Sequence, residues 1–475
     1  MSRHLDAVVV GAGPNGLAAA VALAREGIRV QVIEAADEIG GGARTRDDLT
    51  VPGLVHDVCS GVHPFGVASP FLSSLPLERH GLTWAYPPVD LAHPLDDGTA
   101  GVLYRDLEET VRGLGADGDA WRRTFGPITE QWDAVAADLL GPVVRLPRHP
   151  VATARAGLLS LLPATTLARV FRTPRARALY AGVAAHLYQP LTRPLSASVG
   201  VMMVAAGHRY GWPVARGGSG EISRALASLL VELGGEIVTG ERIRSLRDLP
   251  RARVALLDVT PHQLAEIAGE QLPERARRSA RRWRFGPAAY KVDYAVRGGV
   301  PWTAEPARHA GTLHLGGELE EIAEAERAVA NGALPDNPFV LVAQQYLADP
   351  DRTVDDLVPV WSYAHVPHGY DGDATALIDA QIERFAPGFT DRVVARHVTT
   401  PADFEASNPN YVGGDVAGGA TDPWQLVARP RLSPDPYATA IPGVWLCSAS
   451  TPPGAGVHGL CGYHAARSAL RVLLR

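Results

Sequence analysis

Two glycine-rich stretches near opposite ends of the chain constrain its fold more than any other feature. The first reads Gly11-Ala12-Gly13-Pro14-Asn15-Gly16 and follows an apolar run, and the second spans residues 452–459. Gly11 permits a tight turn after a strand, Gly13 lets the backbone approach a pyrophosphate, and Gly16 lets the next helix pack on the strand. The first stretch therefore predicts a dinucleotide cradle. We expect the second stretch to meet the other end of the same bound molecule.

The segments around the first stretch have the order that such a cradle needs. Residues 6–10 form an apolar strand pattern, residues 17–25 favour a helix, and residues 29–33 favour a second strand. The helix N-terminus would point amide protons at the phosphates. Glu34, with Ala35 beside it, follows the second strand about 20 residues past the glycines, where an acidic side chain suits the ribose hydroxyls. This order makes the prediction of a cradle specific.

A further glycine cluster favours FAD over NAD. Residues 38–45 contain Gly41, Gly42 and Ala43, followed by Arg44. The cluster lets a second length of backbone pass close to a ligand, and the Arg44 guanidinium can offset pyrophosphate charge. By itself the cluster is equally compatible with a flexible surface loop. Two ends of one chain that converge on a single cofactor are, however, typical of flavoproteins and not of ordinary nicotinamide dehydrogenases.

Composition narrows the class of protein further. The chain has 475 residues, which predicts about two to four domains, and 46% of its residues are hydrophobic, which is enough for a large core. A net charge of −6 argues against nucleic acid as a partner. The three cysteines form no C-x-x-C pair and no metal-ligand spacing is visible, so we expect no metal site. With no signal-peptide pattern and no apolar run long enough to span a bilayer, we expect a cytoplasmic protein.

The chain divides into interleaved segments. We predict an α/β fold in which residues 1–75, 210–265 and 436–475 form one discontinuous, Rossmann-like FAD-binding domain of the glutathione-reductase type. Each of these segments combines a short apolar run with a helical pattern and a glycine-rich turn. Residues 76–209 and 266–435 would form a substrate domain of mixed strands and helices. No second glycine triplet follows a strand, so we expect no separate NAD(P)H domain.

These pieces together resemble the phytoene-desaturase-like branch of the flavin amine oxidase superfamily, and the resemblance covers most of the chain. It rests on residues 11–16 and 40–45, on Gly211-Trp212-Pro213 leading to residues 217–220, on Arg429-Pro430-Arg431 followed by Pro436-Tyr437, and on residues 446–459. The last of these motifs is the most specific. The resemblance implies a noncovalent FAD and a reaction that oxidises or isomerises an apolar, often isoprenoid, substrate.

The resemblance also implies which residues bind FAD. They are Gly11, Gly13, Pro14, Asn15, Gly16, Glu34, Ala35, Gly41, Gly42, Ala43, Arg44, Ile243, Gly456, Val457 and His458. The first glycines would hold the pyrophosphate, Glu34 the adenosine ribose, and the Ile243 backbone the adenine. At the other end, Gly456, Val457 and His458 would lie at the flavin ring, where backbone amides stabilise the negative charge of the reduced ring.

One lysine, Lys291, is present among 45 basic residues. Its ammonium is a compact point charge that a guanidinium does not reproduce. Strand alternation over residues 288–296 places Lys291 and Asp293 on one face and the aromatic neighbours on the other. In amine-oxidase relatives a lysine on such a strand holds a water at flavin N5. Lys291 and His458 are therefore our candidate catalytic residues; the alternatives are a solvated strand face and a loop histidine bonded to backbone.

The sequence thus predicts an FAD-dependent oxidoreductase of the dehydrogenase or desaturase type, in which an apolar substrate passes a hydride to flavin N5. Oxygen or a quinone would be the external electron acceptor. The alternatives are an amine oxidase that uses oxygen, an isomerase or saturase that depends on reduced FAD, and a non-catalytic flavin-binding scaffold. The amphipathic pattern of residues 151–172 favours packing on the substrate domain over peripheral contact with a membrane. No feature of the sequence indicates the oligomeric state.

Overall fold

Five short parallel strands form the sheet that carries the first glycine-rich stretch. In the computed structural model, which describes residues 5–474, their order is β16-β10-β1-β2-β9, and every neighbouring pair is parallel. The strands are β1 (Ala7–Val10), β2 (Val30–Ile33), β9 (Glu236–Val238), β10 (Val254–Leu257) and β16 (Val444–Leu446). All residues of β1 and β10 are buried, because helices cover both faces of the sheet.

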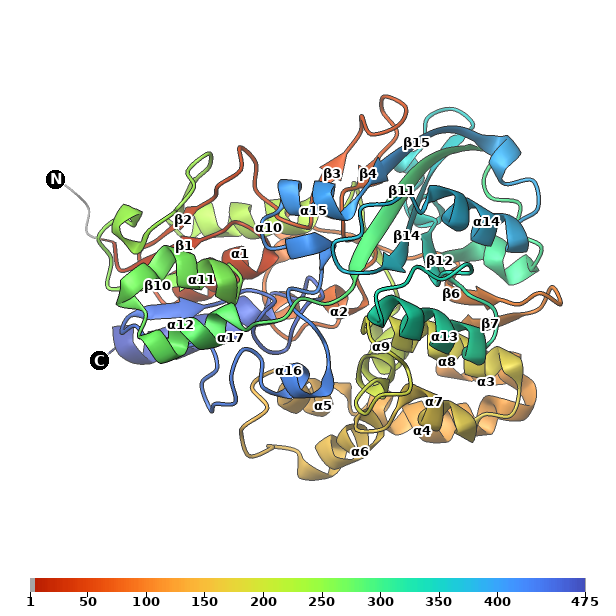
Figure 1. The fold of residues 1–475 in the computed structure, drawn as a ribbon, viewed down its shortest axis with the longest axis horizontal. Coiled ribbons are helices and arrows are strands. Elements are labelled where there is room, and N and C mark those ends of the chain that lie inside the picture. Colours follow the sequence, from red (N-terminus) through yellow and green to blue (C-terminus); the bar gives the residue numbers. More distant parts are fainter. Residues whose placement is uncertain (1–4, 475) are drawn as a thin grey trace.

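Five helices enclose this sheet in the lobe at the left of Figure 1. They are α1 (Pro14–Ala24), α10 (Gly220–Glu232), α11 (Pro261–Ala268), α12 (Glu274–Arg281) and α17 (Leu460–Leu473). Ala7 and Val9 pack towards α1, α10 and α17, whereas Val8 and Val10 pack towards α11. A Cβ on Gly462 of α17 would overlap the Asn15 carbonyl, so the last helix lies directly on the first turn of α1. The two ends of the chain therefore meet at the glycine-rich stretch.

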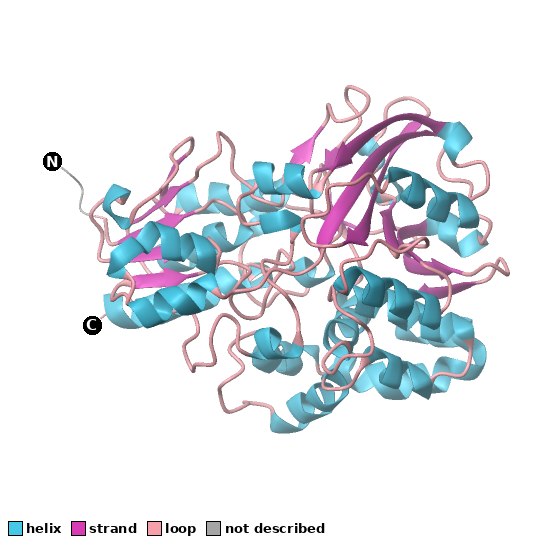
Figure 2. Ribbon diagram, viewed as in Figure 1, coloured by secondary structure: helices cyan, strands magenta, loops and turns pink. Residues whose placement is uncertain are grey.

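A second, seven-stranded sheet occupies the right of Figures 1 and 2. Its order is β15-β11-β14-β13-β12-β6-β7, and all pairs are antiparallel except β12 with β6. The strands are β6 (Val89–Pro94), β7 (Ala100–Leu103), β11 (Ala288–Arg297), β12 (Ala310–Leu315), β13 (Val340–Ala343), β14 (Leu357–Val366) and β15 (Val393–Thr399). The α/β class predicted from the sequence is confirmed, because a parallel, helix-covered sheet is joined to a mixed one.

Helices also cover the seven-stranded sheet. On one face Tyr290, Val292 and Tyr294 of β11 pack towards α14 (Thr375–Phe385). Lys291 and Asp293 point to the opposite face, as the strand alternation predicts, and both are buried. The remaining long helices of this lobe are α3 (Leu107–Leu114), α4 (Gly118–Glu130), α5 (Trp132–Leu139), α6 (Pro150–Ser160), α8 (Pro174–Ala185), α9 (Ala197–Tyr210) and α13 (Leu319–Ala330).

Short helices and two-stranded ladders complete the fold. They are α2 (Pro64–Val67), α7 (Ala164–Leu167), α15 (Pro401–Ser407), α16 (Pro423–Val427), the ladder of β3 (Thr45–Arg46) with β4 (His56–Asp57), and the ladder of β5 (Trp84–Ala85) with β8 (Val214–Ala215). The amphipathic stretch 151–172 is not one helix, because Pro163 separates α6 from α7. Within residues 5–474 no single helix is both long and apolar enough to cross a bilayer. One pair of consecutive helical segments, α6 and residues 164–170, is together long and apolar enough by composition, but the two segments are bent by 102° relative to each other.

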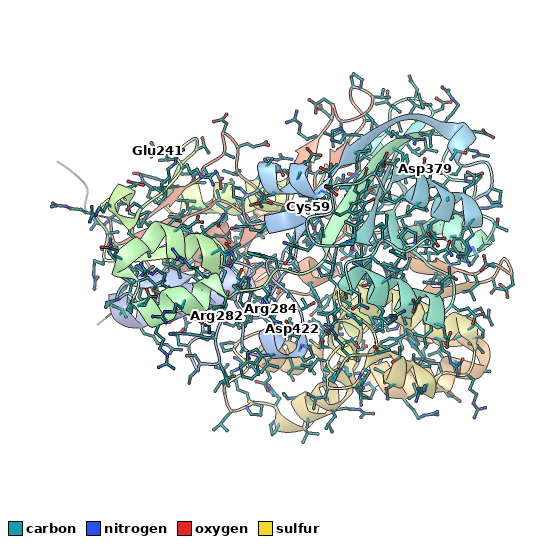
Figure 3. All side chains as sticks on the ribbon, in the orientation of Figure 1. Cys59, Glu241, Arg282, Arg284, Asp379 and Asp422 are labelled. Carbon is teal, nitrogen blue, oxygen red and sulfur yellow. The ribbon has the colours of Figure 1, made fainter. Side chains whose placement is uncertain are left out.

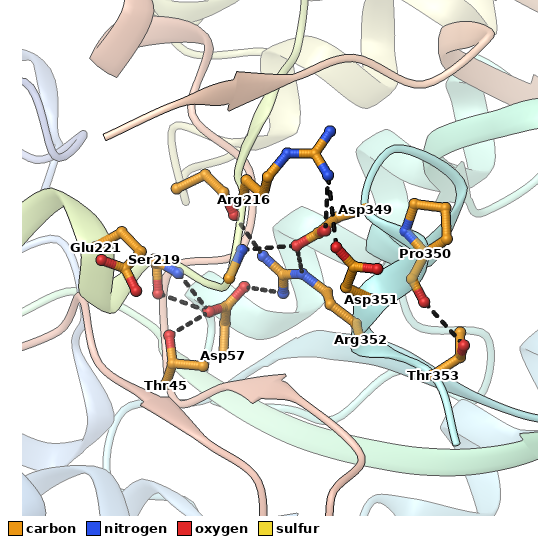
Figure 4. A network of polar contacts seen from close by, with 12 residues as sticks. Thr45, Asp57, Arg216, Ser219, Glu221, Asp349, Pro350, Asp351, Arg352 and Thr353 are labelled. Atoms are coloured by element: carbon orange, nitrogen blue, oxygen red, sulfur yellow. Dashed lines mark hydrogen bonds and ion pairs between the residues drawn. The ribbon is translucent and has the colours of Figure 1, made fainter. Parts of the chain in front are cut away.

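A buried ion network joins three distant segments at the boundary between the lobes (Figure 4). Arg352 is 1% exposed, and its guanidinium lies 2.7 Å from Asp57 and 3.2 Å from Asp349. Asp57 also accepts hydrogen bonds from the Ser219 backbone at 2.7 Å and from the Thr45 hydroxyl at 2.9 Å. Burial would raise the pKa of Asp57, but the Arg352 charge and these donors outweigh it and lower that pKa. The network fixes β3 and β4 against the lobe that contains the seven-stranded sheet.

Replacing Arg352 should destabilise the protein strongly. Arg352→Met leaves Asp57 and Asp349 buried without their cation, which typically costs about 3–5 kcal/mol of unfolding free energy. Arg297→Met is the matched control, because the Arg297–Asp356 pair has a similar distance of 2.7 Å but is exposed; its loss should cost less than about 1 kcal/mol. Urea denaturation measures both. Equal losses for the two variants would contradict a structural role for the network.

Candidate functional site

One continuous cavity of about 660 Å³ lies between the two lobes. Cys59 lines it, and Figure 3 places Cys59 at the middle of the molecule, between the two lobes. The predicted site residues that line the cavity are Gly11, Gly13, Pro14, Asn15, Glu34, Ala35, Gly41, Gly42, Ala43, Arg44, Ile243, Lys291, Gly456 and Val457. Two others, Gly16 and His458, do not line it. The fold therefore brings most of the sequence-predicted residues to a single space.

The first glycine-rich stretch has the backbone geometry of a dinucleotide cradle. Gly11 has φ +101°, a left-handed conformation that favours glycine, and this turn ends β1. A Cβ on Gly16 would overlap the Gly11 carbonyl, so Gly16 lets α1 start directly on the turn. The Asn15 side chain lines the cavity, and its Oδ1 is buried with no hydrogen-bond partner in the protein. A buried acceptor without a partner fits a site that holds a polar ligand.

Two charged side chains are fixed on the same wall. Glu34 follows β2, and its carboxylate accepts hydrogen bonds from the Ala12 N–H at 2.6 Å and the Ala36 N–H at 3.0 Å. The Arg44 guanidinium donates to the Gly41 carbonyl at 2.9 Å and lies 3.2 Å from Glu38. An acid at the end of β2 and a guanidinium beside the glycines are the groups that a ribose and a pyrophosphate require.

Asp258 is a cavity residue that the sequence prediction missed. It directly follows β10, the neighbour of β1, and its Oδ2 accepts a hydrogen bond from the Gly16 N–H at 3.0 Å. Burial raises its pKa to about 7, and the nearby Glu34 charge contributes to that rise. The available signal was positional, because parallel strands end at the same edge of a sheet and ligands bind there. It required knowing that β10 pairs with β1.

Lys291 lies in the cavity wall and is 1% exposed. Its Nζ forms an ion pair with Asp293 and lies 5.9 Å from the centre of the Trp361 ring. The alternative of a solvated strand face is therefore wrong, because the opposite lobe covers this face of β11. A buried cation that faces a cavity is available to a bound molecule.

His458 differs from its predicted place. Its side chain is buried away from the cavity, and Nδ1 accepts a hydrogen bond from the Leu460 N–H at 3.0 Å at the start of α17. Burial lowers its pKa to about 4, so the ring is neutral near pH 7. The imidazole thus occupies the position of a helix cap, and its placement gives no support to a catalytic role. The neighbouring Gly456 and Val457 do line the cavity.

Aromatic side chains line the far end of the cavity. The rings of Tyr188 and Tyr363 are parallel within 3°, with centres 6.2 Å apart, and Trp361 meets Tyr363 edge-on at 5.2 Å. Tyr363 lies directly opposite Lys291 in the β11–β14 register. These three aromatic residues are not among the site residues predicted from the sequence. The signal lay in strand pairing and not in any local motif.

The protonation of Asp258 should make FAD binding depend on pH. Its Oδ2 lies 3.3 Å from the position that a Cβ on Gly13 would occupy, so a charged carboxylate would lie close to a pyrophosphate on the cradle. With a pKa of about 7, Asp258 is neutral below that pH and anionic above it. We expect FAD affinity to fall as pH rises above 7, approaching about tenfold per pH unit. Quenching of FAD fluorescence measures the affinity.

Asp258→Asn is the control for this prediction. An asparagine keeps the shape of the side chain and cannot ionise, so FAD affinity should stay level from pH 6 to pH 8.5 in the variant. A pH dependence of the same size in the variant and in the wild-type protein would assign the effect to another group.

The cavity and fold agree with similarities to known proteins. A model of the NAD(P)-binding Rossmann-like domain matches residues 9–72. The sequence is 26% identical to hydroxyneurosporene desaturase from Cereibacter sphaeroides, over 98% of this chain and 97% of the relative. It is also 26% identical to mouse pyridine nucleotide-disulfide oxidoreductase domain-containing protein 2, over 100% of this chain and 94% of the relative. The fold matches cyclohexylamine oxidase from Brevibacterium oxydans with a TM-score of 0.58, 18% identity, and coverage of 99% of this chain and 100% of that chain.

These similarities extend along the whole chain and agree with the cradle that the structure builds. The turn at Gly11, the partnerless Asn15 oxygen and the fixed Glu34 and Arg44 groups fit the phosphates and ribose of FAD, and a cavity continues beyond them towards Lys291. The chain is therefore an FAD-dependent oxidoreductase that is similar in sequence to the hydroxyneurosporene desaturases, and it shares the fold of putrescine oxidase and cyclohexylamine oxidase.

Proposed function

We propose that this FAD-dependent oxidoreductase dehydrogenates a neutral, apolar, isoprenoid-like substrate, in a reaction of the desaturase type. The observation that carries the proposal is the distribution of charge on the cavity wall. Among the described lining residues, every carboxylate belongs to the FAD cradle and its surroundings. They are Glu34, Glu38, Glu241, Asp258 and Glu266.

The other end of the cavity is apolar and holds no carboxylate among its described lining residues. Its wall includes Val62, Phe65, Leu187, Tyr188, Val199, Met203, Leu341, Trp361 and Tyr363. A cationic amine would enter this space without a counter-charge and would meet the Lys291 ammonium, which is unfavourable in a region that excludes water. A neutral hydrocarbon gains from the same apolar surface.

The residues at this end of the cavity have different roles in the proposed reaction. FAD, when bound, supplies the acceptor for a hydride. The rings of Tyr188 and Tyr363 and the aliphatic side chains beside them give an extended apolar substrate a surface to pack against. Lys291 is the only lysine among the described residues that line the cavity, and its Nζ carries the proton that the reaction exchanges. The similarity to hydroxyneurosporene desaturase supports this assignment, and oxygen or a quinone would accept the electrons afterwards.

A flavin amine oxidase is the second candidate, favoured by one observation. Aromatic rings in the wall of a cavity, here Tyr188 and Tyr363, also suit a neutral amine that packs against them. The structural similarity to putrescine oxidase, with a TM-score of 0.59 and 18% identity, concerns the fold alone. The lack of a carboxylate at this end of the cavity favours the apolar substrate over an amine that arrives as a cation.

An exposed apolar surface supports delivery of such a substrate from a membrane. Leu146 and Val151 are 91% and 82% exposed, and Trp424 of α16 is 69% exposed. α6 lies at the lower edge of Figure 1 and α16 above it, and Leu426 of α16 lines the cavity. We propose that this edge makes peripheral contact with the apolar phase that holds the substrate. Large exposed apolar side chains that gather at one edge are typical of such contacts.

Anaerobic reduction of the holoprotein tests the proposed function. A neutral isoprenoid hydrocarbon in detergent micelles should bleach the oxidised flavin band, whereas dodecylamine should not, because the cavity offers an amine no counter-charge. Absorbance at the flavin band measures both reactions. Bleaching by the amine alone would favour the amine oxidase, and bleaching by NADPH alone would favour an isomerase or saturase charged by a pyridine nucleotide.

Vesicle flotation tests the membrane contact. The wild-type protein should float with neutral phosphatidylcholine vesicles, and the double variant Leu146→Ser, Val151→Ser should lose most of that association, because two exposed apolar anchors are removed. Val394→Ser, a change at another exposed apolar residue that lies on β15, is the control. Equal flotation of all three proteins would show that Leu146 and Val151 do not mediate membrane contact.

A further inference from the structure

We infer that four residues, Lys291, Asp293, His56 and Thr50, form a proton path from the cavity to solvent. The inference rests on the proposed function, because a dehydrogenation releases one proton from the substrate besides the hydride. The substrate end of the cavity has no carboxylate among its described lining residues, so that proton needs another acceptor in the cavity wall.

The first link joins the cavity to the interior of the protein. Lys291 lines the cavity, and its Nζ forms an ion pair with Oδ2 of Asp293, which is fully buried. Burial would raise the pKa of Asp293, but Lys291 and His56 outweigh it and lower that pKa. The ion pair holds Nζ of Lys291 directly against a carboxylate oxygen of Asp293, so a proton moves between the two groups over a short distance.

His56 forms the second link. It lies on β4, its side chain is fully buried, and its Nδ1 is 3.3 Å from Oδ1 of Asp293. Neither of these two atoms has a hydrogen bond of regular geometry. A small rotation of the imidazole completes the contact, so the ring is placed to receive a proton at Nδ1. A ring with two nitrogens accepts a proton on one side and releases one on the other.

Thr50 forms the last link. The Oγ1 of Thr50 lies 2.8 Å from Nε2 of His56, on the far side of the ring from Asp293. Thr50 lies in the connection between β3 and β4, next to exposed residues 46–48, and is itself partly exposed. The four residues therefore lead from the cavity wall, along the face of β11 that carries Lys291 and Asp293, to the surface.

A purely structural role explains these residues poorly. Burying an ion pair gains little stability over apolar residues of the same volume, and polar atoms left without regular hydrogen bonds cost free energy. The Arg352 network differs in this respect, because both carboxylate oxygens of Asp57 accept regular hydrogen bonds there, from Ser219 and from Arg352. The looser contact between Asp293 and His56 suits a group that changes its partner during proton transfer.

Other ionisable groups surround the path. His397 of β15 lies opposite Asp293, Tyr363 of β14 lies opposite Lys291, and Arg46 of β3 lies opposite His56. Cys59 lies close enough to Lys291 for their charges to interact, and Asp48 pairs with Arg46 at 2.6 Å. His397 is partly exposed, so it is the competing exit from Asp293 that an experiment must distinguish.

Each transfer moves one proton and no electrons. Lys291 passes a proton from Nζ to Oδ2 of Asp293 and takes the substrate proton in its place. Asp293 passes a proton from its carboxyl to Nδ1 of His56. His56 releases the proton of Nε2 to Oγ1 of Thr50, whose own hydroxyl proton enters solvent. One proton leaves the cavity for each substrate molecule, and Lys291, Asp293 and Thr50 regain their starting protonation. His56 ends with its proton on Nδ1, and a half-turn of the ring returns that proton to the Thr50 side before the next cycle.

Histidine ring nitrogen NMR tests the connection in the protein without FAD. The ring signals of His56 are those that disappear in His56→Gln. Lys291→Met should move these signals, because the change at the cavity wall reaches His56 through Asp293. The signals of exposed His309, on the far side of the same sheet lobe, should stay in place. Ring signals of His56 that are identical in the wild-type protein and in Lys291→Met would overturn the inference.

Proton release from the holoprotein tests the direction of the path. The flavin is first photoreduced under anaerobic conditions and then oxidised by ferricyanide in weak buffer with a pH dye. This oxidation converts the reduced anionic flavin to oxidised flavin with loss of two electrons and one proton. In the wild-type protein the proton should appear together with the flavin band. In His56→Gln and Thr50→Val it should lag behind the flavin band by about tenfold or more.

Three further outcomes decide the inference. Added imidazole should abolish the lag of His56→Gln, which a folding defect would not allow, and Thr50→Val keeps the test valid if His56→Gln folds poorly. His397→Gln should behave as the wild-type protein; a lag in this variant, with none in His56→Gln, would overturn the inference. A protein whose flavin no donor reduces would refute the proposed function, and the NMR comparison would still decide whether the path exists.

Discussion

The close packing of the last helix on the first glycine-rich turn is the constraint on which the rest of the structure depends. Gly462 leaves no space for a Cβ against the Asn15 carbonyl, and Gly16 leaves none against the Gly11 carbonyl. α1 is thereby held between the parallel sheet and α17, with its first turn open to the cavity. The loop before α17 is carried to the same space, so Gly456 and Val457 line the cavity that Gly11 and Gly13 begin.

The cavity that results has two chemically different ends. The end in the parallel-sheet lobe has fixed charges and free polar atoms, and it suits phosphates and a ribose. The other end lies against the face of β11 that carries Lys291, and aromatic and aliphatic side chains line it. The Arg352 network holds β4 between these ends, and β4 carries both Asp57 and His56. The short β3–β4 ladder thus contributes Asp57 to the contact between the lobes and His56 to the proposed proton path.

The sequence predicted the cradle well because each of its parts is local. A strand, a glycine turn, a helix and an acid at Glu34 follow one another within about 25 residues, and short-range physics determines such units. The alternation that placed Lys291 and Asp293 on one face of β11 was also local, and the structure confirms it. The end of the chain was recognisable as a glycine-rich loop, but its backbone direction was not, and the His458 ring caps α17 instead of facing the cavity.

The remaining site residues depended on pairing between distant strands. Tyr363 became a cavity residue because β14 pairs with β11 in one particular register, and Asp258 because β10 lies beside β1. His56 meets Asp293 across more than 200 residues of sequence. No periodicity within a segment contains that information, since a shift of one residue in register would turn each side chain to the opposite face.

The central claim is that the cradle and the Lys291 face enclose the two ends of a single bound FAD. A crystal structure of the holoprotein measures this most directly. The account predicts the adenosine ribose against Glu34, the pyrophosphate at Gly11 to Asn15, and the flavin ring beside Gly456 and Lys291. A flavin ring that lies outside the cavity, with Lys291 in contact only with Asp293 and apolar side chains, would contradict it.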